Sequence, residues 1–297
     1  PVVIILAMRP GPSTGMPTKT EQSDLFLALY GSHGDATRVV MAPTSVPDCF
    51  RVTALAFDLA EKYQLPVIVL VDQALSARLE TVEPRLVKRA PSASRLTAKL
   101  REDAPFTRYQ LSESGVSPAA LPGTKGGEHM VTGMEHDEKG NFACDEETHT
   151  AMTVKRFRKL SAIEGDPLTH ELCSHFGDKE AEIGIISWGS SAGPVEEAVS
   201  IAKNLGIPVQ AIIPKILNPL PHQELKAFLG KVKRVIVPEL NFVGQLATLL
   251  RSTYRIPTIG LTKVKGVPLE PTEIVKKIVE TAETLNVRSM KHYGRAG

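Results

Sequence analysis

The first quarter of the chain alternates short apolar runs with amphipathic segments. The run at 2–7 is continuous and β-branched, and runs of the same kind stand at 38–42 and 66–71. Strands of a parallel sheet are apolar on both faces, so these runs predict three such strands, with the first one fully buried. The segments 20–30 and 48–63 between them carry apolar residues at helical spacing. This order of strands and helices predicts an α/β fold with helices on the faces of a parallel sheet.

A second alternation of the same kind begins near residue 181. Its expected strands are 182–188, 208–213, 232–237 and 256–261, and its expected helices are 194–205, 223–229, 242–254 and 271–285. Between the two alternations the chain is polar and weakly periodic, with one helix expected at 145–163. A structureless connection of this length is unusual inside a compact domain. We therefore expect an α/β domain at 1–75, an irregular connecting arm at 76–166 and a second α/β domain at 167–297.

Composition excludes several classes of protein. The chain has 297 residues, is 42% hydrophobic and carries a formal net charge of +2. A charge this small, without basic residues clustered among aromatics, gives no footprint for nucleic acid. No apolar run approaches the roughly 20 residues needed to span a bilayer. Three cysteines lie far apart without a CxxC pair, which favours a reducing, cytoplasmic compartment and predicts no zinc or iron–sulfur site within this chain.

A stiffened loop follows the first expected strand and carries a single arginine. The segment 9–18 contains Arg9, two glycines, three prolines and several hydroxyl side chains. Proline fixes φ and glycine admits positive φ, so the loop is expected to hold one shape. Ligands of open α/β sheets bind at the carboxyl ends of the strands, where this loop stands. The planar fork of Arg9 suits a carboxylate or a phosphate, and a structural salt bridge in a rigid turn is the alternative.

A short motif between the strand at 182–188 and the next helix matches the nucleophile elbow of serine hydrolases. Ser191 stands at the centre of Gly-Ser-Ser-Ala-Gly, and Glu239 and His292 follow in the order that such a triad requires. The alternative is a turn of small residues that leads the strand into its helix. Glu239 and Asn241 stand at a strand end before a helix, where they either cap that helix or bind a polar group.

Several motifs together resemble a known family. They are the segments 9–18 (Arg-Pro-Gly-Pro-Ser-Thr-Gly-Met-Pro-Thr), 21–24, 30–34, 132–140 and 238–245. With them the chain resembles, over almost its whole length, the α subunit of 2-oxoacid:ferredoxin oxidoreductases, nearest to the 2-oxoglutarate type. The resemblance implies that 1–75 is the C-terminal part of a pyrimidine-type thiamine diphosphate domain. It likewise implies that 167–297 is a transketolase C-terminal-like domain, so both parts have parallel sheets.

The resemblance also implies a reaction, cofactors and partners. Enzymes of this family decarboxylate a 2-oxoacid on thiamine diphosphate, pass electrons through a [4Fe–4S] cluster to ferredoxin, and deliver the acyl group to coenzyme A. The expected reaction is the oxidation of 2-oxoglutarate to succinyl-CoA. A β subunit is expected to hold most of the thiamine diphosphate, the Mg²⁺ and the cluster, which makes the protein a hetero-oligomer. The same chemistry on pyruvate or another 2-oxoacid, and a non-catalytic assembly domain, are the alternatives.

By the same resemblance, substrate-binding residues lie on the loop after the first strand. Arg9 holds the carboxylate of the 2-oxoacid, and Thr18 shapes the pocket for its side chain. Ser13 and Thr14 belong to the same substrate-binding set. No catalytic residue is assigned, because the catalytic glutamate of the family belongs to a part that precedes Pro1. The chain is therefore expected to be N-terminally incomplete and inactive without that part and its partner.

The arm concentrates glycine, histidine and carboxylate residues at 122–140. The spacing of His129, His136 and Asp137 matches no zinc pattern, so no metal site is predicted. The resemblance instead implies an active-site loop, acting as a mobile cover, that contains Glu135, His136 and Asp137.

Overall fold

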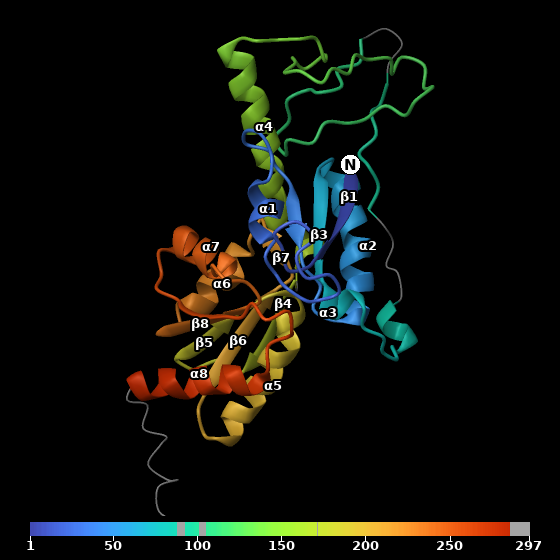
Figure 1. Ribbon diagram of the computed structural model, residues 1–297. Coiled ribbons are helices and arrows are strands. Elements are labelled where there is room, and N and C mark those ends of the chain that lie inside the picture. The colour runs from blue at the N-terminus through green and yellow to red at the C-terminus, as the bar shows by residue number, and fades with distance from the viewer. Residues whose placement is uncertain (88–92, 101–104, 171, 286–297) are drawn as a thin grey trace, which may run out of the picture.

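The computed structural model describes residues 1–87, 93–100, 105–170 and 172–285, shown in Figure 1. Within these residues four strands form the first sheet, in the order β1 (Val2–Met8), β3 (Pro66–Asp72), β2 (Val39–Met41) and β7 (Ile216–Asn218). The first three strands run parallel, and β7 runs antiparallel to β2. The helices of this part are α1 (Leu25–Tyr30), α2 (Val46–Tyr63) and α3 (Gln73–Ser76). The predicted α/β class is confirmed, and β7 is an antiparallel addition that the sequence pattern did not predict.

The first strand lies at the edge of its sheet, and the prediction that it is fully buried is wrong. Val2, Ile4 and Ile5 remain 51%, 44% and 53% exposed. The reason is that β1 pairs with β3 on one side, and no described strand pairs with its other side. A continuous apolar run therefore identifies a strand with two apolar faces, but not which atoms cover those faces.

Five described strands form the second sheet. Their order is β4 (Cys173–Gly177), β6 (Val209–Pro214), β5 (Ile183–Ile186), β8 (Arg234–Glu239) and β9 (Ile259–Thr262). Four of them are parallel, and β4 pairs antiparallel with β6. The helices of this part are α5 (Ala192–Asn204), α6 (His222–Leu229), α7 (Gln245–Tyr254) and α8 (Pro271–Thr284). α5 and α8 pack on one face of the sheet, and α6 and α7 pack on the other. The expected strands and helices of this region are thus confirmed, apart from the unexpected β4.

A shared apolar core joins the two sheets. Met8, Leu25 and Leu70 of the first part lie in the same buried cluster as Trp188 and Leu246 of the second part. All five side chains are at most 1% exposed. Burial of this extent gives each part apolar contacts that it lacks alone, so the two sheets hold one arrangement.

The connection between α3 and α4 (Glu146–Glu164) has little regular structure in its described part. It contains a 3₁₀ turn at Pro84–Val87 and isolated bridges, as its weak periodicity predicts. It is fastened at Gln64, between α2 and β3: the Gln64 side-chain amide donates to the Ser117 carbonyl at 2.7 Å and accepts from Arg108 at 3.0 Å. The part of the arm at 105–145 therefore lies at the amino end of the first sheet, whereas the 3₁₀ turn lies near α3 (Figure 1). Among the helices of the described chain, none combines the length and apolar character of a membrane span.

Candidate functional site

The loop between β1 and α1, residues 9–24, lies where the carboxyl ends of the two sheets meet. Its hydrogen bonds reach Asp72 at the end of β3, Trp188 just beyond β5 and Leu240 just beyond β8. This is the edge of an open α/β sheet at which ligands bind. The loop follows the carboxyl end of its strand, as predicted, and it also contacts the second sheet.

Thr20 fastens this loop to the first sheet and to the loop after β9. Its hydroxyl donates to the Asp72 carboxylate at 3.2 Å and accepts from the Ala74 amide at 3.4 Å. Its own backbone amide donates to the Gly266 carbonyl at 3.3 Å. Thr20 is 3% exposed, so water does not compete for these bonds.

Gln22 fastens the same loop to the second sheet. Its side-chain amide donates to the Trp188 carbonyl at 3.0 Å, and its side-chain oxygen accepts from the Ser191 hydroxyl at 3.1 Å and the Leu240 amide at 3.2 Å. Its backbone amide donates to the Leu240 carbonyl at 2.6 Å, and its carbonyl accepts from the Asn241 side chain at 3.1 Å. Gln22 is fully buried, and these five bonds to other described residues satisfy its polar groups.

The tip of the loop folds back on itself. The Met16 amide donates to the Pro10 carbonyl at 3.0 Å, which closes a tight turn. Gly15 is required there, because a Cβ would stand 1.7 Å from the Pro10 oxygen and because φ is +53°. Ser13 and Thr18 also have positive φ, at +55° and +60°, which is uncommon for residues other than glycine.

The four predicted substrate-binding residues lie together on this loop. Arg9, Ser13, Thr14 and Thr18 are all exposed. No carboxylate of the described chain forms an ion pair with the Arg9 guanidinium. The alternative interpretation of Arg9 as half of a structural salt bridge therefore finds no partner in that part of the molecule.

The predicted active-site loop of the arm has partners of its own. Glu135 pairs with His149 at 2.6 Å and with Arg156, both on α4. Partial burial raises the pKa of Glu135, but hydrogen bonds from these two side chains lower it below its ordinary value. The ring of His136 stacks on Tyr109 with 4.0 Å between centroids.

Asp137 closes a turn within the same loop. Its carboxylate accepts from the backbone amides of Lys139 and Asn141 at 2.8 and 2.9 Å, and from the Asn141 side chain at 3.1 Å. The bond from the Asn141 side chain contributes most to lowering the pKa of Asp137. Among the described residues no group of three histidine, cysteine or carboxylate side chains could hold a metal ion.

The structure does not bring these two groups of residues together within the chain. Arg9 follows the carboxyl end of β1, whereas Glu135 is paired with α4 beside the amino end of β3. β1 and β3 pair in parallel over seven residues, from Val2 opposite Pro66 to Met8 opposite Asp72. A strand of seven residues spans about 20 Å, so about that length of sheet separates the two groups.

The hydrolase interpretation of the Gly-Ser-Ser-Ala-Gly motif gains no support. Ser191 is 1% exposed, and its hydroxyl donates to Gln22. The Glu239 carboxylate accepts from the Leu246 and Ala247 amides at 2.7 and 3.0 Å, at the start of α7. Burial raises the pKa of Glu239, and those hydrogen bonds lower it only in part. His292 lies outside the described residues.

The capping alternative for the strand end is confirmed. The Asn241 side-chain oxygen accepts from the Gly244 and Gln245 amides at 2.8 and 3.2 Å. Together with Glu239 it satisfies amides of the first turn of α7 that have no partner within the helix.

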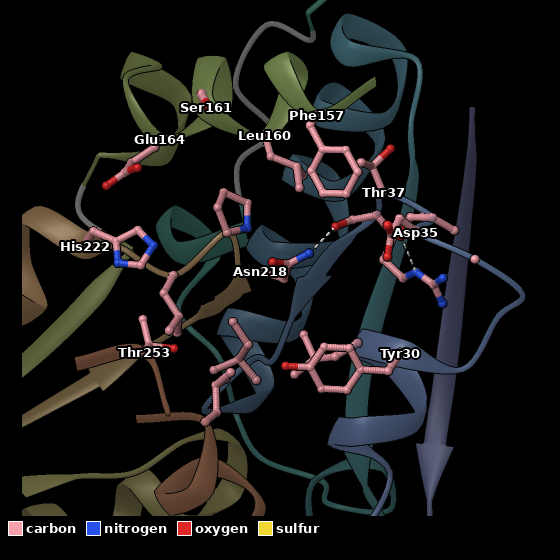
Figure 2. A pocket seen from close by; sticks show the side chains of 18 residues that line it. Tyr30, Asp35, Thr37, Phe157, Leu160, Ser161, Glu164, Asn218, His222 and Thr253 are labelled. Carbon is pink, nitrogen blue, oxygen red and sulfur yellow. Dashed lines mark hydrogen bonds between the residues drawn. The ribbon is translucent and has the colours of Figure 1, made fainter. Parts of the chain in front are cut away.

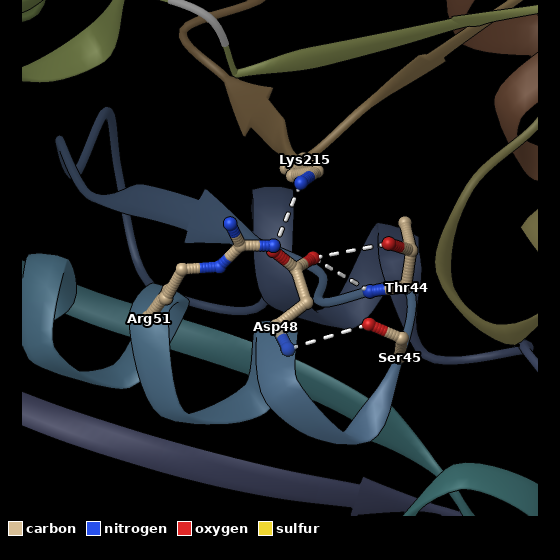
Figure 3. A network of polar contacts seen from close by, with 5 residues as sticks. All are labelled: Thr44, Ser45, Asp48, Arg51 and Lys215. Carbon is tan, nitrogen blue, oxygen red and sulfur yellow. Dashed lines mark hydrogen bonds and ion pairs between the residues drawn. The ribbon is translucent and has the colours of Figure 1, made fainter. Parts of the chain in front are cut away.

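Sequence reasoning missed a second connection between the two parts. Asp48, at the start of α2, accepts from the Thr44 amide at 2.9 Å and pairs with Lys215 at 2.8 Å (Figure 3). Its side chain is 2% exposed and that of Lys215 is 13% exposed. The Ser45 hydroxyl caps α2 by accepting from the Asp48 amide. The spacing Ser-x-x-Asp was a signal for this cap, but nothing local pointed to Lys215.

A cavity of about 590 Å³ lies beside α1, at the other end of the first sheet from the 9–24 loop (Figure 2). Tyr30, Glu164 and His222 stand on its walls, and His222 bonds to the Tyr254 hydroxyl at 2.8 Å. The segment 34–38 that lines it leads into the amino end of β2. Since ligands of open α/β sheets bind at carboxyl ends, the 9–24 loop is the stronger candidate site.

Comparison with known proteins agrees with this fold. Residues 1–155 match the family model described as pyruvate flavodoxin/ferredoxin oxidoreductase, thiamine diphosphate-binding. Residues 181–274 match the model of pyruvate:ferredoxin oxidoreductase core domain II.

Individual relatives are similar across nearly the whole chain. Subunit α of 2-oxoacid:ferredoxin oxidoreductase 2 from Aeropyrum pernix is 37% identical over 290 residues, which cover 95% of this chain and 44% of that protein. The 2-oxoglutarate oxidoreductase subunit KorA from Mycobacterium tuberculosis is 38% identical, with 92% and 41% covered. A solved structure of 2-oxoglutarate:ferredoxin oxidoreductase from Magnetococcus marinus, with 2-oxoglutarate, coenzyme A and succinyl-CoA bound, matches with a TM-score of 0.85 and 39% identity, covering 94% and 48%. The chain spans less than half the length of each of these relatives.

Proposed function

Because the chain belongs to the pyruvate flavodoxin/ferredoxin oxidoreductase family, we propose that it forms part of the α subunit of a 2-oxoacid:ferredoxin oxidoreductase that acts on 2-oxoglutarate. The reaction converts 2-oxoglutarate and coenzyme A to succinyl-CoA and carbon dioxide, with two electrons passed to ferredoxin. The KorA relative and the solved structure with 2-oxoglutarate bound support this choice of substrate. We propose 1–75, 76–166 and 167–297 as the pyrimidine-domain part, the connecting arm and the second domain.

The observation that carries the proposal is the exposed Arg9 on a loop fastened at the carboxyl edge of the sheet. A guanidinium without a carboxylate partner in the described chain is available to an incoming anion. Its two parallel N–H groups match the two oxygens of a carboxylate, and such a charge-assisted pair fixes orientation as well as position. The hydroxyls of Ser13, Thr14 and Thr18 stand exposed on the same loop and offer further hydrogen bonds to the oxoacid.

The hydrogen-bond donors of this loop suit the carboxylate of a 2-oxoacid rather than thiamine diphosphate and its Mg²⁺. Thiamine diphosphate, when bound, supplies the carbanion chemistry of decarboxylation. The described residues contain no cluster of three metal ligands for a diphosphate-bound Mg²⁺. We propose that a β subunit holds most of the cofactor, the Mg²⁺ and the [4Fe–4S] cluster, and that this chain orients the substrate.

The arm loop has a separate place in the proposal. Glu135, His136 and Asp137 stand about the length of the first sheet from Arg9 of the same chain. We propose that they act as an active-site loop only in the assembled complex, at a site to which a neighbouring subunit contributes. Exposed apolar side chains beside them, Met134 at 59% and Val131 at 70%, support contact with another subunit.

The proposal is tested with the complete complex that contains this chain, a panel of 2-oxoacids, coenzyme A and a viologen dye. We expect the highest kcat/KM for 2-oxoglutarate. Arg9→Ala is expected to lower kcat/KM by about 10- to 100-fold, the scale of a lost hydrogen bond to a charged group. Lys19→Ala removes an exposed charge from the same loop and is expected to leave kcat/KM within about twofold.

Two results would contradict the proposal. Dye reduction that does not depend on any 2-oxoacid would exclude the reaction, and equal losses in the two variants would exclude a specific role for Arg9. A preference for pyruvate would retain the chemistry and replace the substrate.

A further inference from the structure

The loop between β1 and α1 has two halves that differ in burial. Its first half carries the exposed residues Arg9 and Thr18, whereas Thr20 is 3% exposed and Gln22 is fully buried. One residue separates the exposed Thr18 from the buried Thr20, and one more separates Thr20 from Gln22. The exposed half therefore cannot shift without disturbing the buried half that follows it.

Gln22 makes contacts that the local helix does not need. α1 begins at Leu25, and Asp24 stands at its cap position. The five hydrogen bonds of Gln22 run instead to groups 166 to 219 positions away in the sequence, at the ends of β5 and β8. A buried amide that is satisfied entirely by distant partners fixes its segment relative to those partners.

The conformation of Thr18 also requires support from its surroundings. Its φ of +60° is an unfavourable region for a β-branched residue, and such conformations persist when neighbouring contacts over-determine them. The neighbouring contacts are those of Thr20, whose hydroxyl bonds to Asp72 and whose amide bonds to the Gly266 carbonyl.

We propose that Gln22 and Thr20 are positioning residues that hold the Arg9 loop in its substrate-binding shape by tying it to both sheets at once. This inference rests on the proposed function. Neither side chain touches the substrate; they set the backbone on which Arg9 and Thr18 stand. Their loss therefore weakens binding of the acid, and Arg9 itself remains present.

Gln245 provides a matched control. It is a buried glutamine, 7% exposed, that also ties the α1 segment to the second part of the chain. Its amide donates to the Ser23 carbonyl at 2.6 Å, and its oxygen accepts from the Phe26 amide at 3.0 Å. It thus holds the junction at the α1 end of the loop, through Ser23 and Phe26.

The test compares Gln22→Met with Gln245→Met in the complete complex. Both substitutions remove buried amide bonds between the same two parts and keep the side-chain size. We expect Gln22→Met to raise the KM for 2-oxoglutarate about tenfold, with kcat changed less than about threefold, since a displaced loop weakens ground-state binding. Hydrogen–deuterium exchange of the amides at 13–18 is expected to rise in Gln22→Met alone.

Thr20 gives a second test that does not depend on the fold tolerating Gln22→Met. Thr20→Val has the same shape without the hydroxyl and is expected to raise both KM and exchange at 13–18. Thr20→Ser restores the hydroxyl and is expected to return both values to those of the wild type.

The outcomes separate this inference from the proposed function. If Arg9→Ala lowers kcat/KM but Gln22→Met and Gln245→Met have equal KM and equal exchange at 13–18, the positioning role is overturned and the function stands. If the wild-type complex does not turn over any 2-oxoacid, the function fails. In that case exchange at 13–18 alone decides whether Gln22 and Thr20 hold the loop.

Discussion

The loop that carries Arg9 is held mainly by uncharged groups at the carboxyl end of the first sheet, whereas the arm is held mainly by charged groups at the amino end. At the carboxyl end Gln22 bonds to backbone groups and to side chains of the second part, and it is fully buried. At the amino end Lys155 donates to the Gly115 carbonyl at 3.2 Å, and Lys159 donates to the Gln64 carbonyl at 3.3 Å. Both lysines are 8% exposed.

Because of this difference, the attachment of the Arg9 loop is expected to be independent of pH, whereas the attachment of the arm is expected to depend on it. Amide hydrogen bonds keep their donors and acceptors at every physiological pH, so the loop that carries Arg9 is expected to hold its shape. Burial, and then the charge of Arg108, lower the pKa of Lys155 to about 8, and burial and the charge of Lys155 do the same for Lys159. The attachment of the arm is therefore expected to vary with pH and salt.

The largest effect on stability is expected from the charged group at the carboxyl end, Asp48. Asp48→Ala leaves Lys215 without its carboxylate and the Thr44 amide without its acceptor, at a site where both charged side chains are at most 13% exposed. Breaking a buried ion pair from one side costs about 3–5 kcal/mol in unfolding free energy. Chemical denaturation measures this loss.

The control for Asp48→Ala is an exposed ion pair of the same length. Glu180 and Lys231 are 2.8 Å apart, with side chains 81% and 47% exposed. Glu180→Ala is expected to cost less than about 1 kcal/mol, because water and salt screen exposed pairs. Similar losses in the two variants would show that Asp48 does not join the two parts as the structure indicates.

The next effect tests the pH response of the amino end. A lysine whose pKa is lowered from 10.5 to about 8 in the folded chain binds fewer protons there than in the unfolded chain between those values. The free energy of unfolding therefore rises with pH from about 8 to 10.5, and the destabilisation from burying the charge is fully present below pH 8. Lys159→Met is expected to remove about 1–3 kcal/mol of this rise.

Denaturation curves at pH 7.5 and pH 9.5 measure that rise for the wild type and for Lys159→Met. Lys139→Met removes an exposed lysine of the same arm and is expected to leave the rise unchanged. If the unfolding free energy changed by the same amount between these pH values in the wild type and in Lys159→Met, the buried-lysine argument would be refuted.

Much of the fold could be predicted from short-range patterns. The strands at β3, β5, β6 and β8 are continuous apolar runs, and α2, α7 and α8 have apolar residues at helical spacing. These patterns depend on neighbours within a few residues, which the sequence displays directly. The cap of α7 was foreseen for the same reason, because Glu239 and Asn241 stand next to the amides that they satisfy.

Long-range contacts could not be predicted in this way. The helix expected from residue 20 begins at Leu25, because Thr20 and Gln22 direct their polar groups to distant strands rather than to a helix. The sequence pattern does not predict β7, because three residues show no periodicity and because its partner β2 is about 175 positions away. The candidate substrate loop could be identified because its glycines, prolines and arginine are close together in the sequence, whereas its fastening by Gln22 has no local signal.

The smallest effect on stability is expected at the tip of the arm, where the ion pairs of Glu135 are partly exposed. Glu135 is 19% exposed in its side chain and pairs with Arg156, at 39%, and His149, at 67%. Glu135→Gln keeps the shape and removes the charge, and it is expected to cost less than about 1 kcal/mol of unfolding free energy at pH 7. Since the folded pKa of Glu135 is lowered, its contribution is present above the ordinary value of 4.5 and disappears as the pH falls below it.

Limited proteolysis at pH 7 and pH 4, together with denaturation curves, measures this effect on the arm. We expect faster cleavage of Glu135→Gln than of the wild type at pH 7 and a smaller difference at pH 4, because the stabilisation from the Glu135 carboxylate decreases below pH 4.5. Glu128→Gln is the control, since it removes an exposed carboxylate of the same arm. Equal cleavage of all three proteins at pH 7 would mean that the pairing of Glu135 with α4 does not hold the arm, and that other contacts, such as those of Gln64 and the two buried lysines, fasten it.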